Sequence, residues 1–230
     1  MPFKIRRLAY ILNIETATKN CSVSIANNGE TIVLKELSTA NYSHAEKLHE
    51  FINFVIEESN IEINQLDAIA VSKGPGSYTG LRIGVSAAKG LCFALNIPLI
   101  SVNTLTVLAT SISQHEGFII PLLDARRMEV YSSVFNFDGT ILEKVKAEII
   151  DENSFNNYLT KGKVSLIGDG VEKCKGVIAH ENAIFIDEKL PSANEMSSLS
   201  YDKYKKNDIE DVAYFEPFYL KDFVAIKSKK

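Results

Sequence analysis

Two acidic residues stand where apolar stretches of the sequence end, and such positions often carry chemistry. Glu15 follows the apolar run at residues 10–14, and Asp124 follows the run at 118–123. A carboxylate at a strand end can organise a cation and a phosphate, but hairpins that hold phosphate are rich in glycine, and none follows Glu15 before Gly29. Asp124 precedes two arginines, which favours a fixed ion pair that joins two strands. We therefore treat Glu15 and Asp124 as a vestigial ligand site.

A glycine-rich loop separates another apolar run from a helical pattern. It consists of Gly74, Pro75, Gly76, Ser77, Tyr78, Thr79 and Gly80, with Arg82 in the first turn of the helix that follows. Backbone N–H groups at a helix N-terminus can bind an anion. The order of residues nevertheless fails the Walker and dinucleotide motifs, because Leu-Arg follows Gly80 and Thr79 replaces the third glycine. The loop favours a tight turn with close backbone packing, and Arg82 either reaches an anionic group or faces solvent.

Metal, thiol and serine chemistry find little support in the sequence. His44 and His49 are five residues apart, which places them about 140° apart around a helix, whereas ligands on one face need a spacing of three or four. Cys21, Cys92 and Cys174 form no pair and no zinc spacing, so we expect buried thiols in a reducing compartment. No serine stands in a G-x-S-x-G setting. We expect neither a metal nor another cofactor.

Composition limits the class of protein. The 230 residues include 25 basic and 29 acidic side chains, a net charge of −4, and 46% of them are hydrophobic. This is the composition of a globular chain, and its mild acidity argues against a dedicated nucleic-acid binder. The apolar run at 8–12 is too short for a secretory leader, and no run approaches the ~18–20 residues of a membrane span. We expect a cytoplasmic protein without a membrane contact.

The elements that must position these residues alternate between strands and helices. Strands are expected at 10–14, 21–26, 31–36, 66–71, 99–102, 118–123, 130–137, 141–145, 164–167 and 183–186. Helices are expected at 43–59 with Ser43 as its cap, 79–95, 104–113 with Thr104 as its cap, 154–159, just after Gly170, and around 196–199. Hairpins mixed with β–α crossovers predict an α/β chain with mixed sheets.

The helix at 79–95 is apolar on nearly every side. Its only charges are Arg82 and Lys89, and glycines at 80 and 84 begin a row of small residues that would let another helix approach closely. Such a helix is either buried in the core or covered by a partner. With the apolar stripe of 43–59, it predicts a partner interface formed by Leu48, Ile52, Val55, Gly80, Gly84, Ala87, Ala88 and Leu91.

Several motifs, in order, carry a resemblance to a known family. They are Ile11–Thr18, Cys21–Ser24, His44–Leu48, Gly74–Gly84, Asp124–Arg126 with Glu129–Tyr131, and Pro217–Leu220. Together they resemble the bacterial tRNA threonylcarbamoyladenosine biosynthesis protein TsaB family, also called YeaZ. Two positions depart from the family pattern: Glu15 stands where Asp is usual, and Met128 stands where glycine is common.

The resemblance implies an actin-like ATPase fold of the sugar kinase/Hsp70 superfamily, with mixed sheets in two α/β lobes and a reduced second lobe. The first lobe would span residues 1–104 and be closed by residues 212–230. The smaller lobe would span residues 105–211.

The resemblance also implies a non-catalytic subunit of the complex that places threonylcarbamoyl on the adenosine next to the tRNA anticodon. Its partners would be a TsaD-like catalytic subunit and a TsaE-like ATPase, with tRNA reached through the complex and a homodimer as the alternative when alone. The helices at 43–59 and 79–95 would pack against the equivalent pair of the partner. The H-x-x-x-H metal motif of TsaD is absent here. The open alternative is an actin-like-fold kinase or acyl transferase that binds ATP and acts alone.

Overall fold

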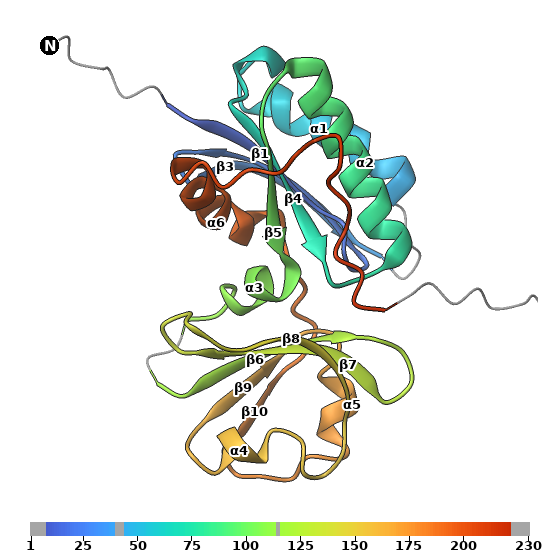
Figure 1. Ribbon diagram of the computed structural model, residues 1–230, viewed down its shortest axis with the longest axis vertical. Coiled ribbons are helices and arrows are strands. Elements are labelled where there is room, and N and C mark those ends of the chain that lie inside the picture. The colour runs from blue at the N-terminus through green and yellow to red at the C-terminus, as the bar shows by residue number, and fades with distance from the viewer. Residues whose placement is uncertain (1–7, 40–43, 114–115, 222–230) are drawn as a thin grey trace, which may run out of the picture.

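The chain folds into two lobes, each built on a five-stranded mixed sheet (Figure 1). This computed structural model describes residues 8–39, 44–113 and 116–221. The first sheet has the strand order β3-β2-β1-β4-β5 and the second has the order β10-β9-β6-β7-β8. The predicted α/β class with mixed sheets is therefore confirmed.

The first sheet begins with an antiparallel meander and continues with parallel strands. β1 (Tyr10–Glu15), β2 (Asn20–Asn27) and β3 (Glu30–Ser38) are antiparallel, and the β2–β3 turn uses left-handed backbone at Asn28 and Gly29. β4 (Ala68–Gly74) pairs parallel to β1, and β5 (Leu99–Asn103) pairs parallel to β4. A 3₁₀ turn at Ile63–Gln65 precedes β4. These pairings bring the ends of β1 and β4 to one edge of the sheet.

Helices cover both faces of the first sheet. α1 (His44–Glu58) and α2 (Tyr78–Leu95) lie on one face and share one core with it, whereas α6 (Ala193–Lys205) lies on the opposite face (Figure 1). α2 begins at Ser77, whose hydroxyl accepts a hydrogen bond from the Gly80 N–H, and ends at Asn96 in left-handed backbone. The predicted cap of α1, Ser43, lies outside the described residues.

The second sheet is smaller and has short helices on one side. Its strands are β6 (Phe118–Asp124), β7 (Glu129–Asn136), β8 (Ile141–Ile149), β9 (Val164–Ile167) and β10 (Ala183–Ile186). α4 (Asn156–Leu159) and α5 (Glu172–Lys175) pack below it, and α3 (Thr104–Ala109) lies between the two lobes (Figure 1). One core joins α3 to the second sheet.

Several predicted boundaries differ from the structure. α3 ends at Ala109 instead of 113, and its cap is Asn103 instead of Thr104, because the Asn103 amide oxygen accepts hydrogen bonds from the N–H groups of residues 105 and 106. The strand predicted from residue 66 begins at Ala68, because Leu66 still closes the preceding 3₁₀ turn through its N–H bond to the Ile63 carbonyl.

The predicted division between the lobes also differs. Residues 193–205 were expected in the second lobe, but α6 packs on β1, β2, β3 and β5 of the first sheet. After β10 the chain therefore returns to the first lobe. Residues 209–221, which we call the C-terminal strap, run across this lobe from β5 toward α2 (Figure 1).

Candidate partner interface and lobe junction

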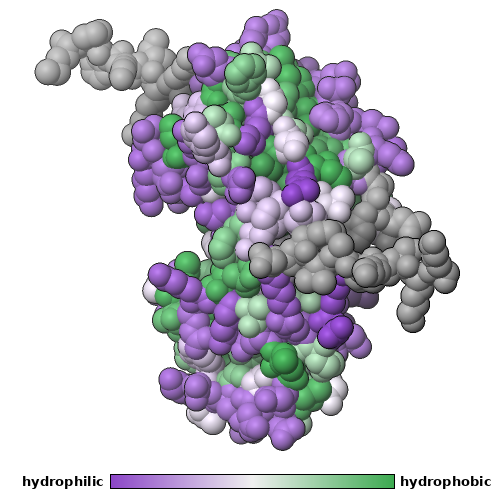
Figure 2. Space-filling model, turned by 45° about the vertical axis from the view of Figure 1, so that its right-hand side comes forward, coloured by the Kyte–Doolittle hydropathy of each residue, from purple (hydrophilic) through white to green (hydrophobic). Residues whose placement is uncertain are grey.

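Apart from Arg82 in its first turn, the exposed residues of α2 carry no charge. Leu81, Val85, Ala88 and Cys92 point into the core, whereas Ser86, Gly90, Phe93 and Ala94 are exposed, Phe93 at 83%. A Cβ atom added at Gly90 would meet nothing within 4 Å. The space-filling view turns this side forward and shows apolar surface among hydrophilic residues on the upper lobe (Figure 2). We call Ser86, Gly90, Phe93 and Ala94 the α2 outer face.

The two charged side chains of α2, Arg82 and Lys89, form hydrogen bonds with the C-terminal strap. The Lys89 ammonium donates hydrogen bonds to the carbonyl oxygens of Ala213 (3.2 Å) and Phe215 (2.9 Å) in the C-terminal strap. Arg82 Nε donates to the Tyr219 hydroxyl at 3.2 Å, and the Arg82 guanidinium lies 4.2 Å from the centre of the Tyr78 ring. The strap therefore covers one flank of α2 and leaves the outer face open.

The first two glycines of the predicted small row pack against this chain and not against a partner. A Cβ atom at Gly80 would lie 2.1 Å from the Thr16 carbonyl oxygen, and one at Gly84 would lie 2.2 Å from Thr16 Oγ1. Thr16 Oγ1 also donates a hydrogen bond to the Gly80 carbonyl at 2.8 Å. The prediction that these glycines admit a partner helix is wrong, because the β1–β2 turn fills that space.

Other members of the predicted interface are also enclosed by the fold. Leu48, Ile52, Val55 and Ala88 are at most 3% exposed and lie in the core of the first lobe, so they cannot contact a partner directly. Ala87 and Leu91 are partly buried against that core. Sequence reasoning missed the outer face, although Ser86, Gly90 and Ala94 recur every four residues, a spacing that places small side chains in one row.

The glycine-rich loop forms a tight turn whose polar groups bond within the chain. The Ser77 N–H donates to the Ala17 carbonyl at 2.6 Å, and a Cβ atom at Gly76 would lie 2.4 Å from that same oxygen. Gly74 has φ +112° and precedes the cis peptide bond to Pro75. Thr79 is exposed at the start of α2. The interpretation of the loop as a tightly packed turn is confirmed.

Glu15 lies in the interior at the end of β1. It is fully buried, and Oε1 accepts a hydrogen bond from the Ala17 N–H at 2.6 Å. Burial raises the pKa of Glu15 to about 7, and the hydrogen bonds to the charged form only partly oppose this rise. Burial, with the nearby Glu15 charge, also raises the pKa of Cys21 to about 11. The Glu15 carboxyl thus stabilises, through this hydrogen bond, the β1–β2 turn against which α2 packs.

Asp124 stands at the equivalent end of β6 but is exposed. Its Oδ1 pairs with the Lys173 ammonium at 2.7 Å and accepts the Arg126 N–H at 2.5 Å. The expected pair of Asp124 with an arginine is therefore wrong: Asp124 pairs with Lys173 of α5, and Arg126 contributes only its backbone N–H. The Asp124 N–H donates to Asp169, whose pKa is raised by burial and by the Asp124 charge. Within the described part of the chain, no hydrogen bond or ion pair joins Glu15 to Asp124.

The histidines do not converge on a metal site. Nε2 of the buried His44 lies 2.7 Å from the Thr18 carbonyl oxygen, and burial lowers the His44 pKa, while His49 is exposed. Across residues 8–39, 44–113 and 116–221, no three His, Cys, Asp or Glu side chains cluster in a way that could hold a metal ion. In the same segments, none of the helices combines the length and apolar character needed to cross a bilayer.

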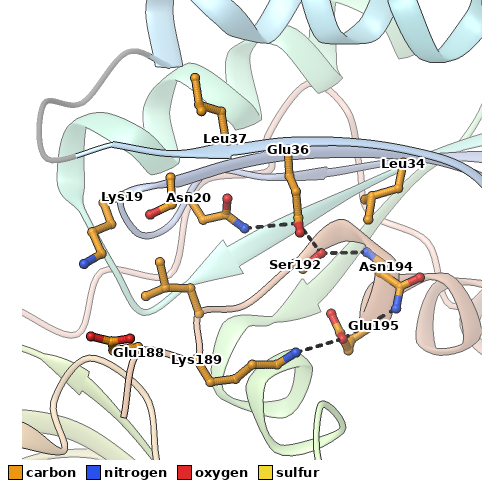
Figure 3. A pocket seen from close by; sticks show the side chains of 12 residues that line it. Lys19, Asn20, Leu34, Glu36, Leu37, Glu188, Lys189, Ser192, Asn194 and Glu195 are labelled. Atoms are coloured by element: carbon orange, nitrogen blue, oxygen red, sulfur yellow. Dashed lines mark hydrogen bonds and ion pairs between the residues drawn. The ribbon is translucent and has the colours of Figure 1, made fainter.

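A shallow crevice of about 740 Å³ lies between β3 and the segment that returns to the first lobe (Figure 3). Glu36 projects into it and accepts hydrogen bonds from the Ser192 hydroxyl at 2.6 Å and the Asn20 amide at 3.3 Å. The crevice also contains the ion pair of Lys189 and Glu195 (3.6 Å). Its polar groups thus bond to one another across the crevice.

Comparison with known proteins identifies the family. The model of the family described as "TsaD: tRNA N6-adenosine threonylcarbamoyltransferase" matches residues 38–228. The Haemophilus influenzae "tRNA threonylcarbamoyladenosine biosynthesis protein TsaB" is 30% identical over 94% of this chain and 95% of its own. The chain belongs to the TsaB family. TsaB membership assigns it to tRNA threonylcarbamoyladenosine biosynthesis, as the resemblance predicted.

Two further relatives place this TsaB chain among known folds and enzymes. The structure of YeaZ from Pseudomonas aeruginosa superposes with a TM-score of 0.80 at 24% identity, over 92% of this chain and 100% of that one. The two-lobed actin-like fold is therefore confirmed. A "tRNA N6-adenosine threonylcarbamoyltransferase" from Anoxybacillus flavithermus is 39% identical over 116 residues, which are 44% of this chain and 34% of the relative.

Proposed function

We propose that this TsaB-family chain is a non-catalytic subunit that binds a TsaD-like threonylcarbamoyltransferase through α1 and α2. The observation that carries the proposal is the uncharged α2 outer face, with Phe93 83% exposed. Surface helices normally direct charged side chains to water, so an uncharged exposed face favours a protein partner. Helices pack at 8–10 Å between axes, and the row Ser86, Gly90 and Ala94 suits the short end of that range.

The sequence similarity to a transferase supports an interface in which equivalent helices of the two subunits pack on each other. The relative from Anoxybacillus flavithermus shares 39% identity with part of this chain. Two related subunits can pack the same elements on each other in a near-twofold arrangement, which also makes a second copy of this chain the natural alternative occupant. A TsaE-like ATPase and tRNA would then join the complex that this pair forms.

The contribution of this chain to the reaction would come from binding alone. A subunit that binds the active conformation of its partner more tightly than the inactive one increases the active population. The contacts around the β1–β2 turn agree with this role, because the carbonyl oxygens of Ala17 and Thr18 bond to Ser77 and His44 of the chain itself. This turn is packed against helices and does not form the open, glycine-rich cradle that a phosphate needs.

Two variants on the outer face test the proposal. Gly90→Leu and Ala94→Glu should weaken association with the TsaD-like subunit by at least about 30-fold, because each places bulk or charge where a helix must approach. Both positions are exposed, so neither substitution should lower the thermal midpoint of the isolated chain. Association is measured by size exclusion and calorimetry, and tRNA modification by the reconstituted complex is followed in parallel.

The matched control lies on the opposite side of the lobe. Ser198 is exposed on α6, so Ser198→Glu adds the same charge to a helix away from the outer face and should leave association unchanged. Wild-type affinity in both outer-face variants would refute the assignment of this surface.

A further inference from the structure

The turn between β6 and β7 carries two arginines in left-handed backbone. Arg126 has φ 70° and Arg127 has φ 50°, and both side chains are exposed. Left-handed backbone costs a residue other than glycine roughly 1–2 kcal/mol, so two such residues in succession are unusual. Strain of this kind persists only where the surrounding structure holds it, and it gathers at functional sites.

The turn is held from both ends. The Ala125 N–H donates to the Glu129 carbonyl at 3.1 Å, and the Glu129 N–H donates back to the Arg126 carbonyl at 3.2 Å. Asp124 accepts the Arg126 N–H, and its carboxylate is fixed in turn by Lys173, whose side chain is only 14% exposed. The backbone that presents the two guanidinium groups is thus ordered in advance.

The surroundings of the turn contain ion pairs and aromatic rings. Lys221 of the strap pairs with Glu129, and its ammonium lies 5.9 Å from the centre of the Tyr131 ring. The strap links this point to the start of α2, because Tyr219 contacts both Arg82 and the Tyr78 ring, whose centre is 5.0 Å away. A band of alternating cations and tyrosines therefore runs from α2 to the β6–β7 turn.

At the turn itself, the two arginines are the charges that lack an ion-pair partner among the described residues. Asp124 and Glu129 are paired with Lys173 and Lys221, whereas neither Arg126 nor Arg127 forms an ion pair with any residue that the structure describes. The whole chain has a net charge of −4, so these two arginines form a local positive site on an acidic protein. Such a site can attract an anionic partner.

We propose that the arginine turn, residues 125–128, binds the phosphate backbone of RNA. The proposal rests on the proposed function, since the substrate of the complex is a tRNA. Guanidinium groups match phosphate geometry with two parallel N–H bonds, and holding the backbone beforehand lowers the entropy cost of binding. Tyrosines between the cations favour a nucleic acid over an acidic protein, because bases stack on aromatic rings.

The test compares two pairs of adjacent, exposed basic residues in the full-length chain. Fluorescence anisotropy measures binding of an unmodified tRNA transcript, to the chain alone and to its complex with the TsaD-like subunit, across a salt series. Arg126→Ala/Arg127→Ala should weaken binding roughly tenfold and lower the slope of log K against log salt by about 1.5, since each phosphate contact contributes ~0.7–0.9. The control, Lys205→Ala/Lys206→Ala at the end of α6, should change neither quantity.

The outcomes separate this inference from the proposed function. Association with the TsaD-like subunit is measured for the same variants, and the arginine variant should keep it. Equal losses of RNA affinity in both pairs, or no loss in either, would overturn the RNA contact even if the complex forms. Loss of subunit association with unchanged RNA binding would overturn it too, and would assign the turn to an acidic protein surface.

Discussion

Glu15 makes the stability of the fold depend on pH. Its pKa is raised from 4.5 to about 7 by burial, so the folded state holds this proton more tightly than the unfolded state. The contribution of Glu15 to stability therefore falls as pH rises from about 4.5 to about 7 and is level above that range. Glu15→Gln keeps the oxygen that accepts the Ala17 N–H but cannot ionise, so it should abolish this fall. At pH 8 the variant should be more stable than wild type by up to about 3 kcal/mol, at 1.36 kcal/mol per pH unit.

Urea unfolding at pH 5, 6, 7 and 8 measures the free energy of unfolding of wild type and of Glu15→Gln. Glu57 is exposed on α1, and Glu57→Gln should retain the wild-type dependence on pH. Parallel curves for wild type and Glu15→Gln between pH 5 and 7 would show that Glu15 is not the group responsible.

At the scale of the element, two glycines of α2 should respond in opposite ways to the same change. Gly90→Ala adds a methyl group in open space and should stabilise the isolated chain by about 0.5–1 kcal/mol through helix propensity. Gly84→Ala places a Cβ atom 2.2 Å from Thr16 Oγ1 and should cost about 1–3 kcal/mol. Thermal unfolding of the single variants and of Thr16→Ala/Gly84→Ala tests the cause, because removing Oγ1 should recover part of the loss. Equal effects at the two glycines would contradict this account.

The same helix shows how far sequence alone could go. Periodicity located α2, its end near Leu95 and its seam of Leu81, Val85 and Ala88, because these depend on local spacing. It could not show that Thr16 fills the space beside Gly80 and Gly84, since that contact joins residues 64 positions apart. The predicted interface therefore included residues of α2 that pack inside the chain.

The sequence predicted α6 too short, around residues 196–199 instead of Ala193–Lys205, for a related reason. Part of the packing of α6 on the sheet is polar: the Asn13 amide donates to the Ser197 hydroxyl at 3.3 Å, and the Ser200 hydroxyl donates to Asn13 Oδ1 at 2.7 Å. Hydrophobic spacing marks a helix poorly when serines face the core. The lobe boundary expected at residue 211 was wrong for the same reason, whereas β9 and β10 were placed correctly because each is a short, mostly apolar segment.

For the molecule as a whole, the path of the chain ties the two lobes together. The second lobe is inserted between β5 and α6, so the first lobe is complete only when the chain has passed through both. α3 adds a physical link, since it packs against β4 and β5 on one side and against β6 and β7 on the other. Leu105 and Leu108 of α3 share a core with Leu123 and Phe135 of the second sheet. Unfolding of either lobe would therefore expose apolar surface of the other.

This arrangement predicts that the lobes unfold in one cooperative transition. Met196 of α6 and Leu166 of β9 are both fully buried, in the first and second lobe respectively. Met196→Ala and Leu166→Ala should each cost about 2–5 kcal/mol, and each should lower the same calorimetric transition without splitting it. Hydrogen exchange should report weakened protection in β1 and in β6 for either variant, because opening one lobe removes the α3 contacts of the other. Two resolved transitions, or exchange that changes only in the substituted lobe, would mean that α3 does not transmit stability between the cores.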